Sequence, residues 1–166
     1  SGLNQPSFSN GAVILDLDMD GDLDYVVNNI NDPAFVFENK LNQQKKAPSY
    51  LRIKLEGPKN NPQALGAKVW VKWGKGKMAY QEMQVVRGYM SSTEPIVHFG
   101  LDSAAVVEEL IVKWADGKVQ NLKQVPVNRV LSLAYSKASP GAKSVAVEDI
   151  ALGNQLFDEV STALGI

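Results

Sequence analysis

Five aspartates stand at every second position of the stretch LDLDMDGDLD, residues 15–24. A tight loop can turn alternate carboxylates toward one point, and Gly21 supplies the bend that such a loop needs. Carboxylates packed this closely repel one another unless a cation binds between them. A hard cation, which takes about six to eight oxygen ligands, matches a set of carboxylates of this kind. The stretch therefore predicts a Ca²⁺ site. The expected ligands are the carboxylates of Asp16, Asp18, Asp20 and Asp24 and the backbone carbonyl of Asp22.

The aspartate stretch does not follow the EF-hand pattern. The twelfth position of that loop requires a bidentate Glu, but Val27 stands there, and the sequence YVVNN that follows the aspartates is typical of a strand. The competing interpretation is an acidic hairpin without a metal, although solubility alone does not require strict alternation.

Groups that could catalyse a reaction are few. The chain has no cysteine, and its single histidine, His98, lies between Val97 and Phe99 in an apolar run that favours a structural role. No nucleophile elbow, phosphate-binding loop or recognisable carboxylate pair is present in the sequence. We therefore expect the chain not to be an enzyme.

The tryptophans offer a different chemistry, because an exposed indole can stack on a sugar ring. Trp70 and Trp73 differ by three positions, so they lie on opposite faces of a strand, and one can be buried while the other is exposed. Trp70, Trp73 and Trp114 are therefore candidates for an alternative function, a carbohydrate-binding module. Burial of these rings in the core is the competing interpretation.

The elements that must position these groups are strands. Ten short apolar runs, from residues 12–15 to 130–135, are bounded by Gly, Pro, Asn and Asp, and several alternate with a period of two. Hairpin turns are expected at GKGK and ADGK. This pattern predicts an all-β, antiparallel β-sandwich. Helix is expected only near residues 102–109 and 154–165.

The charged residues are unevenly distributed along the chain, although the net charge is only −1. Residues 1–39 hold seven acids and no base, residues 40–143 hold seventeen bases and seven acids, and residues 144–166 hold four acids and no base. The basic excess suits either an anionic glycan or docking against the chain's own acidic part. No nucleic-acid-binding motif and no apolar run long enough to insert in a membrane is present. Because the chain begins Ser-Gly, we expect it to be a piece of a longer protein.

The sequence SNGAVILDLDMDGDLDYVVNNINDPAFVFEN resembles the closing blade of an FG-GAP/VCBS β-propeller. In that family, the aspartates at loop positions one, three, five and nine bind Ca²⁺ through their side chains and position seven binds through its carbonyl, which implies the same ligands as above. Only part of one blade is present. The resemblance implies a partial blade at residues 1–45. The basic excess of the domain that follows then suits docking of that domain onto its own acidic propeller.

The basic middle resembles the ASPIC/UnbV domain, which follows such propellers in cartilage acidic protein-like and bacterial surface proteins. The motifs LGAKVWV, GYMSS, HFGLD, LIVKWADGKVQNL and NRVLSL occur in the expected order. Asp102 and Ala115 stand where the family usually has Gly and Pro, which puts two turns in doubt. This resemblance implies a β-sandwich at residues 46–136, followed by a linker and the start of another segment at 137–166, where LFDEVSTALGI is similar to a segment that borders these propellers.

Together these features predict a non-catalytic, calcium-binding structural and interaction module. The expected location is extracytoplasmic (secreted, cell-surface or periplasmic), because Ca²⁺ is scarce in the cytosol. The expected partners are a protein or a glycan at the cell surface.

Overall fold

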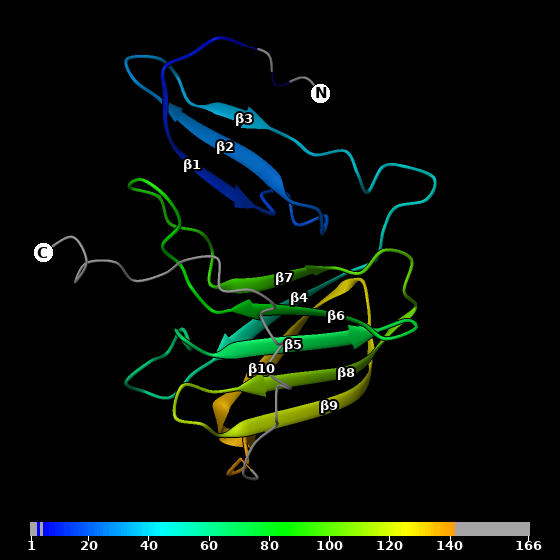
Figure 1. The fold of residues 1–166 in the computed structure, drawn as a ribbon. Coiled ribbons are helices and arrows are strands. Elements are labelled where there is room, and N and C mark those ends of the chain that lie inside the picture. The colour runs from blue at the N-terminus through cyan, green and yellow to red at the C-terminus, as the bar shows by residue number, and fades with distance from the viewer. Residues whose placement is uncertain (1–2, 4, 142–166) are drawn as a thin grey trace, which may run out of the picture.

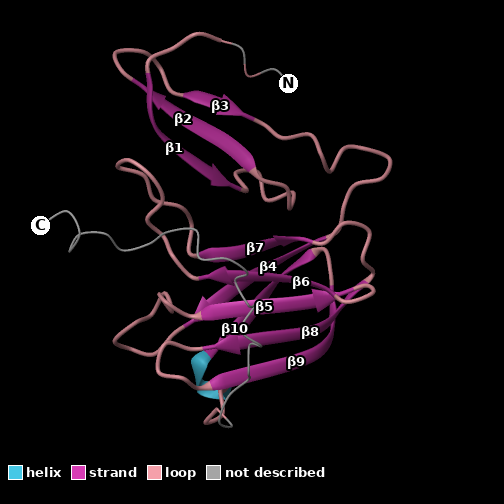
Figure 2. Cartoon of the chain, in the orientation of Figure 1, coloured by secondary structure: helices cyan, strands magenta, loops and turns pink. Residues whose placement is uncertain are grey.

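A computed structural model describes residues 3 and 5–141 of the chain, and its regular elements are ten strands and one short 3₁₀ turn, η1 (Figures 1 and 2). The all-β prediction is confirmed, because each run predicted to be extended contains a strand. The elements are β1 (Ser9–Leu15), β2 (Asp24–Asn29), β3 (Phe35–Phe37), β4 (Tyr50–Glu56), β5 (Lys68–Trp73), β6 (Lys77–Glu82), β7 (Ile96–Gly100), β8 (Val106–Lys113), β9 (Val119–Pro126), β10 (Arg129–Ala134) and η1 (Tyr135–Lys137).

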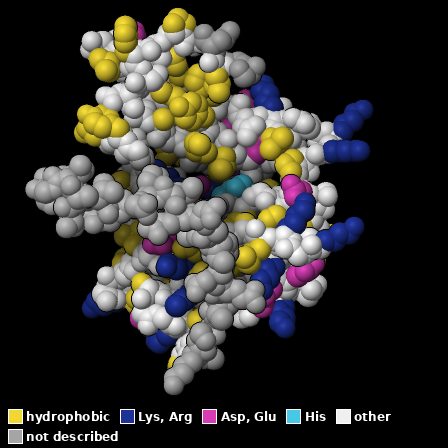
Figure 3. Space-filling view, viewed as in Figure 1, with side chains coloured by type: hydrophobic (Ala, Val, Ile, Leu, Met, Phe, Trp, Pro, Cys, Tyr) yellow, Lys and Arg dark blue, Asp and Glu magenta, His cyan; other side chains and the backbone are white. Residues whose placement is uncertain are grey.

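The first three strands form an antiparallel sheet of their own, which is not hydrogen-bonded strand to strand with the other two sheets (Figure 1). Leu15 pairs with Asp24, so the aspartate stretch is the connection between β1 and β2. Apolar side chains gather on the surface of this part of the molecule (Figure 3). Phe8, which precedes β1, is 78% exposed, and Val36 of β3 is 57% exposed. An isolated three-stranded sheet buries little apolar area, and here its apolar faces lack a full cover among the described residues.

The remaining strands form a sandwich of two sheets, with strand orders β10-β4-β7 and β6-β5-β8-β9. All pairs are antiparallel except β10 with β4. Alternate residues of each sheet point inward, as Leu51, Ile53 and Leu55 do from β4, and together they form one hydrophobic core. The predicted turns at GKGK and ADGK connect β5 to β6 and β8 to β9.

One expected helix is absent from the structure. Residues 102–109 form a turn followed by β8, because Val107, Leu110 and Val112 fill the sandwich core from a strand. Asp102, which stands where the ASPIC/UnbV pattern has Gly, takes a left-handed φ of 52°, a conformation that Asp tolerates better than most residues. The helix expected at 154–165 and most of the predicted linker and following segment lie outside the described residues. Within the described part, no helix is long and apolar enough to span a membrane.

Candidate metal site

The loop between β1 and β2 brings three carboxylates together. Asp16, Asp18 and Asp24 each offer one oxygen, and these oxygens lie within 4.8 Å of one another. Asp16 and Asp24 are buried and Asp18 is exposed, so the cluster opens to solvent on one side. Three carboxylate oxygens at this spacing suit a hard cation.

Backbone N–H groups hold the two buried carboxylates in place. Asp24 accepts hydrogen bonds from Leu17 N (2.9 Å) and from Asn39 N (2.8 Å). Asp16 accepts one from Gly21 N (3.1 Å), and Gly21 has a φ of 95°, which its lack of a side chain permits. These hydrogen bonds fix the positions of the two buried carboxylates relative to the backbone.

Asp20 and Asp22 lie outside the three-carboxylate group. Asp20 Oδ1 accepts a hydrogen bond from Asp22 N (3.0 Å), and Asp22 Oδ2 accepts one from Asn42 N (2.9 Å). The expected inclusion of the Asp20 carboxylate among the ligands stays a prediction, because this carboxylate is not part of the three-oxygen group. Through its contact with Asn42, the side chain of Asp22 joins the loop to the segment that follows β3. The side-chain amide of Asn42 joins the same two segments, because it donates a hydrogen bond to Asp20 O (2.8 Å).

The residues present fit a divalent cation. Asp16 Oδ1 and Asp22 Oδ1 are buried and lack a hydrogen-bond partner among the described residues. Burial raises the pKa of Asp16, although the Arg52 guanidinium and the Gly21 N–H lower it. Burial also raises the pKa of Asp22, where Asp20 and Asp24 add repulsion. These carboxylates therefore carry negative charge that the protein does not fully compensate, and all the donors are hard oxygens.

Two residues of β4 contact the loop and were not anticipated from the sequence. Arg52, only 4% exposed, forms ion pairs with Asp16 and with Glu94, each at 2.5 Å. The ring of Tyr50 lies against Gly21, where a Cβ would overlap it. The alternation in YLRIKLEG places Tyr50 and Arg52 on one face of the strand, but it does not show what that face meets.

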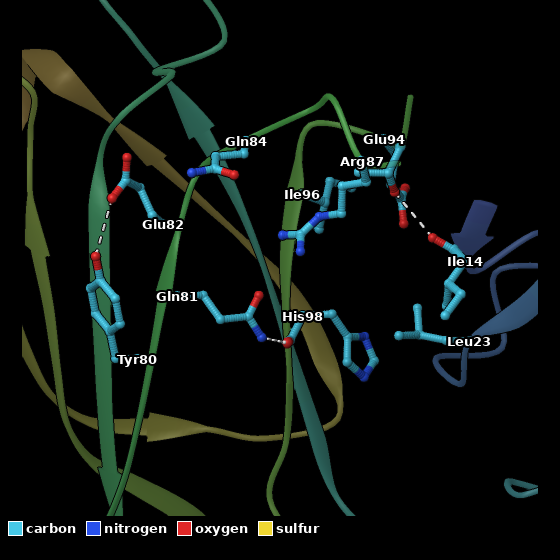
Figure 4. A pocket seen from close by; sticks show the side chains of 11 residues that line it. Ile14, Leu23, Tyr80, Gln81, Glu82, Gln84, Arg87, Glu94, Ile96 and His98 are labelled. Carbon is cyan, nitrogen blue, oxygen red and sulfur yellow. Dashed lines mark hydrogen bonds between the residues drawn. The ribbon is translucent and has the colours of Figure 1, made fainter. Parts of the chain in front are cut away.

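A cavity of about 500 Å³ lies where the first sheet meets the sandwich (Figure 4). Ile14 of β1 and Leu23 of the aspartate loop line it on one side, and His98 lines it from the sandwich. The His98 ring stacks on Tyr50, with centroids 6.0 Å apart, and its Nδ1 has no hydrogen-bond partner in the described part of the chain. Burial lowers the pKa of His98, and the Arg52 charge lowers it further. His98 is therefore a packed, neutral group at pH 7.

The structure separates the three tryptophans. Trp73 and Trp114 are 8% and 3% exposed and belong to the sandwich core, so neither can stack on a sugar, and their candidacy as ligand-binding residues was wrong. Trp70 is partly exposed on the opposite face and packs against Tyr80, with ring centroids 5.1 Å apart. The prediction that Trp70 and Trp73 lie on opposite faces is confirmed.

Comparison with known proteins identifies the sandwich. The family model described as ASPIC and UnbV matches residues 57–140. Cartilage acidic protein 1 of Xenopus tropicalis is 32% identical over 132 residues, which are 75% of this chain and 19% of that protein. The human protein of the same name is 31% identical over 134 residues, 76% of this chain and 19% of its own length. The chain thus spans about a fifth of these relatives, and it belongs to the ASPIC and UnbV family.

Proposed function

We propose that this chain is a non-catalytic, calcium-binding structural and interaction module of a protein that works outside the cytoplasm. The observation that carries the proposal is the cluster of Asp16, Asp18 and Asp24, in which a buried oxygen of Asp16 has no partner among the described residues. Ca²⁺ offsets the repulsion between these carboxylates, clamps the loop between β1 and β2, and so stiffens a surface offered to a protein or glycan.

The first sheet is proposed to be part of an FG-GAP/VCBS propeller blade, with residues 1–45 as that unit and residues 46–136 as the sandwich. Its three strands, its calcium-type loop and its exposed apolar side chains support this proposal, since a blade packs against neighbouring blades. The following segment, from residue 137, is proposed to lead on to another part of the longer protein.

A non-catalytic role is supported by what the acidic side chains of the sandwich contact. Asp102 pairs with Lys77 (2.8 Å), and Glu109 pairs with Lys72 (3.0 Å), so these carboxylates serve local contacts. An extracytoplasmic location is supported by the name of the relatives, which refers to cartilage. Calcium sites of extracellular modules bind with Kd values of ~10⁻⁴–10⁻³ M, which suits the calcium concentration there.

The proposal is tested by titrating the chain with CaCl₂ and comparing its thermal unfolding in calcium and in EDTA. At free calcium about 100-fold above Kd, binding should stabilise the folded state by about 2.7 kcal/mol. Asp18→Asn removes the negative charge of an exposed ligand, so we expect affinity to fall about tenfold or more, a change of about 1.4 kcal/mol. Asp32→Asn, an exposed acid of the same unit outside the cluster, is the matched control. Equal affinity in the two variants would contradict the site.

Asp20 distinguishes this ligand set from one that follows the loop pattern alone. Because its carboxylate lies outside the three-oxygen group, Asp20→Asn should weaken calcium binding less than Asp18→Asn does. Calorimetry on both variants measures the difference. Equal losses would mean that calcium turns Asp20 inward on binding.

A carbohydrate-binding function is a second candidate because one aromatic pair remains accessible. Trp70 and Tyr80 pair across β5 and β6, and the exposed Lys68 and Lys72 lie on the same face of β5. An acidic polysaccharide would find a stacking surface and positive charge there. Trp70→Ala should abolish retention on a sulfated or uronate polysaccharide column, whereas Tyr89→Ala, which removes another exposed ring, should not. No retention of the unmodified chain would eliminate this function.

A further inference from the structure

The acidic loop rests on the sandwich through alternate residues of β4. Tyr50 covers Gly21, and Arg52, two residues further along the same face, reaches Asp16. The segment before β7 makes two more contacts with β1, since Ala12 N donates to Ser91 Oγ (3.1 Å) and Thr93 Oγ1 donates to Ile14 O (3.0 Å). The first sheet thus meets the sandwich at both the loop and the strand that leads into it.

Arg52 is the charged member of this contact, and it is nearly inaccessible. One guanidinium nitrogen lies 2.5 Å from Asp16 Oδ2 and another lies 2.5 Å from Glu94 Oε1. The side chains of Arg52 and Asp16 are 5% and 0% exposed, and that of Glu94 is 26% exposed. Two of its nitrogens are thus paired, while Arg52 Nε is buried without a hydrogen-bond partner among the described residues. Removing one partner of a buried ion pair leaves the other desolvated and unpaired. The ion pairs Asp16–Arg52 and Arg52–Glu94 therefore connect the loop to β4 and to the segment before β7 through side chains that have little freedom to move.

The two oxygens of Asp16 have different roles. Oδ2 accepts hydrogen bonds from Arg52 and from Gly21 N, whereas Oδ1 is buried and has no partner among the described residues. By holding Oδ2, Arg52 fixes the direction of the carboxylate and leaves Oδ1 as the oxygen available to a cation. The orientation of one proposed ligand is therefore set by a side chain of the other structural unit.

We propose that Arg52 is the positioning residue of the calcium loop and couples cation binding to the docking of the first sheet on the sandwich. This inference rests on the proposed calcium site and adds a regulatory consequence to it. A cation on Asp16 Oδ1 restrains the carboxylate, the carboxylate restrains Arg52, and Arg52 restrains Glu94 in the segment that holds β1. Because coupling is reciprocal, docking of the sheet also favours cation binding.

The test compares Arg52→Met with Lys54→Met in the full chain, with CaCl₂ or EDTA as the only additive. Lys54 is the matched control because it lies on the same face of β4 but is exposed. Calorimetry measures binding, and amide hydrogen exchange measures protection of the loop (residues 16–24) and of the docking segment (residues 91–94). In the unmodified chain and in Lys54→Met, calcium should slow exchange about fivefold or more in both segments. In Arg52→Met, calcium should protect the loop alone.

The outcomes separate this inference from the function on which it rests. If the unmodified chain does not bind calcium, the proposed function fails and the coupling fails with it. If Arg52→Met binds calcium and still protects residues 91–94 as the control does, the coupling is overturned while the calcium site stands. If Arg52→Met does not fold, the variant Glu94→Gln is used in its place. Glu94→Gln weakens the Arg52–Glu94 ion pair and leaves the Asp16–Arg52 ion pair intact. Glu94→Gln should likewise lose calcium-dependent protection of residues 91–94, and full protection would overturn the coupling.

Discussion

Arg52 and Lys54 lie two residues apart on the same face of β4, yet Arg52 is buried and Lys54 is exposed. The alternation in YLRIKLEG correctly predicts that the two share a face, because side chains of a strand alternate. It gives no sign that an aspartate 36 residues earlier meets only one of them. The alternation of side chains shows which residues of a strand share a face. It does not show which residues of another sheet contact that face.

At the same scale, acidification should destabilise the sandwich through His98. Burial lowers the pKa of its imidazole below the ordinary value of 6.5. Between that lowered pKa and 6.5, the unfolded chain binds a proton that the folded chain does not, so the free energy of unfolding falls as pH drops through this interval and is fully retained above it. We expect His98→Gln to flatten the dependence of the unfolding midpoint on pH between about pH 7 and pH 6.

The fluorescence of the buried Trp73 and Trp114 reports unfolding of the sandwich, because both belong to its hydrophobic core. The measurements are made in EDTA, so that protons and calcium do not compete for the aspartates of the loop. An unchanged slope in His98→Gln would show that other groups carry the pH dependence.

At the scale of the element, strands could be predicted and side-chain directions in loops could not. The ten strands were recognisable because β-branched and aromatic residues recur between turn residues, and the aspartate stretch was correctly placed between two of them. The Asp20 carboxylate accepts a hydrogen bond from Asp22 N, and the spacing of the aspartates does not reveal this contact. The expected helix at 102–109 failed because small and acidic residues suggested a helical turn where Val107 and Leu110 extend into the core.

Gly21 shows how one element restricts another. Alanine at this position would meet two costs, a left-handed backbone (φ 95°) and an overlap of its Cβ with the Tyr50 ring. Gly117 has nearly the same φ, 89°, but open space around it, so Gly117→Ala meets the backbone cost alone. We expect Gly117→Ala to lose about 1 kcal/mol and Gly21→Ala to lose about 1–3 kcal/mol more. Equal losses in urea denaturation would show that Tyr50 moves away at no cost.

At the scale of the whole molecule, the opposite charges of the two units meet at a single ion pair. Among the described residues, Arg52 is the only base of the sandwich that pairs with an acid of the first sheet and its loop. The sequence predicted attraction between an acidic and a basic part, but most of the basic side chains remain exposed to water, where salt screens them. Docking therefore depends on a few directed contacts more than on the overall charge.

The directed contacts of β1 are the last part of this arrangement to test. Replacing Ser91 with Ala and Thr93 with Val removes the hydroxyl groups that contact Ala12 N and Ile14 O, and valine keeps the shape of threonine. We expect the double variant to exchange amide hydrogens faster along β1, by about fivefold or more, because the strand loses its attachment to the sandwich. The core strand β5 should keep its protection, since its partners β6 and β8 are unchanged.

Ser92→Ala, an exposed neighbour whose side chain has no partner in the described residues, is the control. Unchanged exchange along β1 in the double variant would mean that Arg52 and Tyr50 suffice to hold the first sheet.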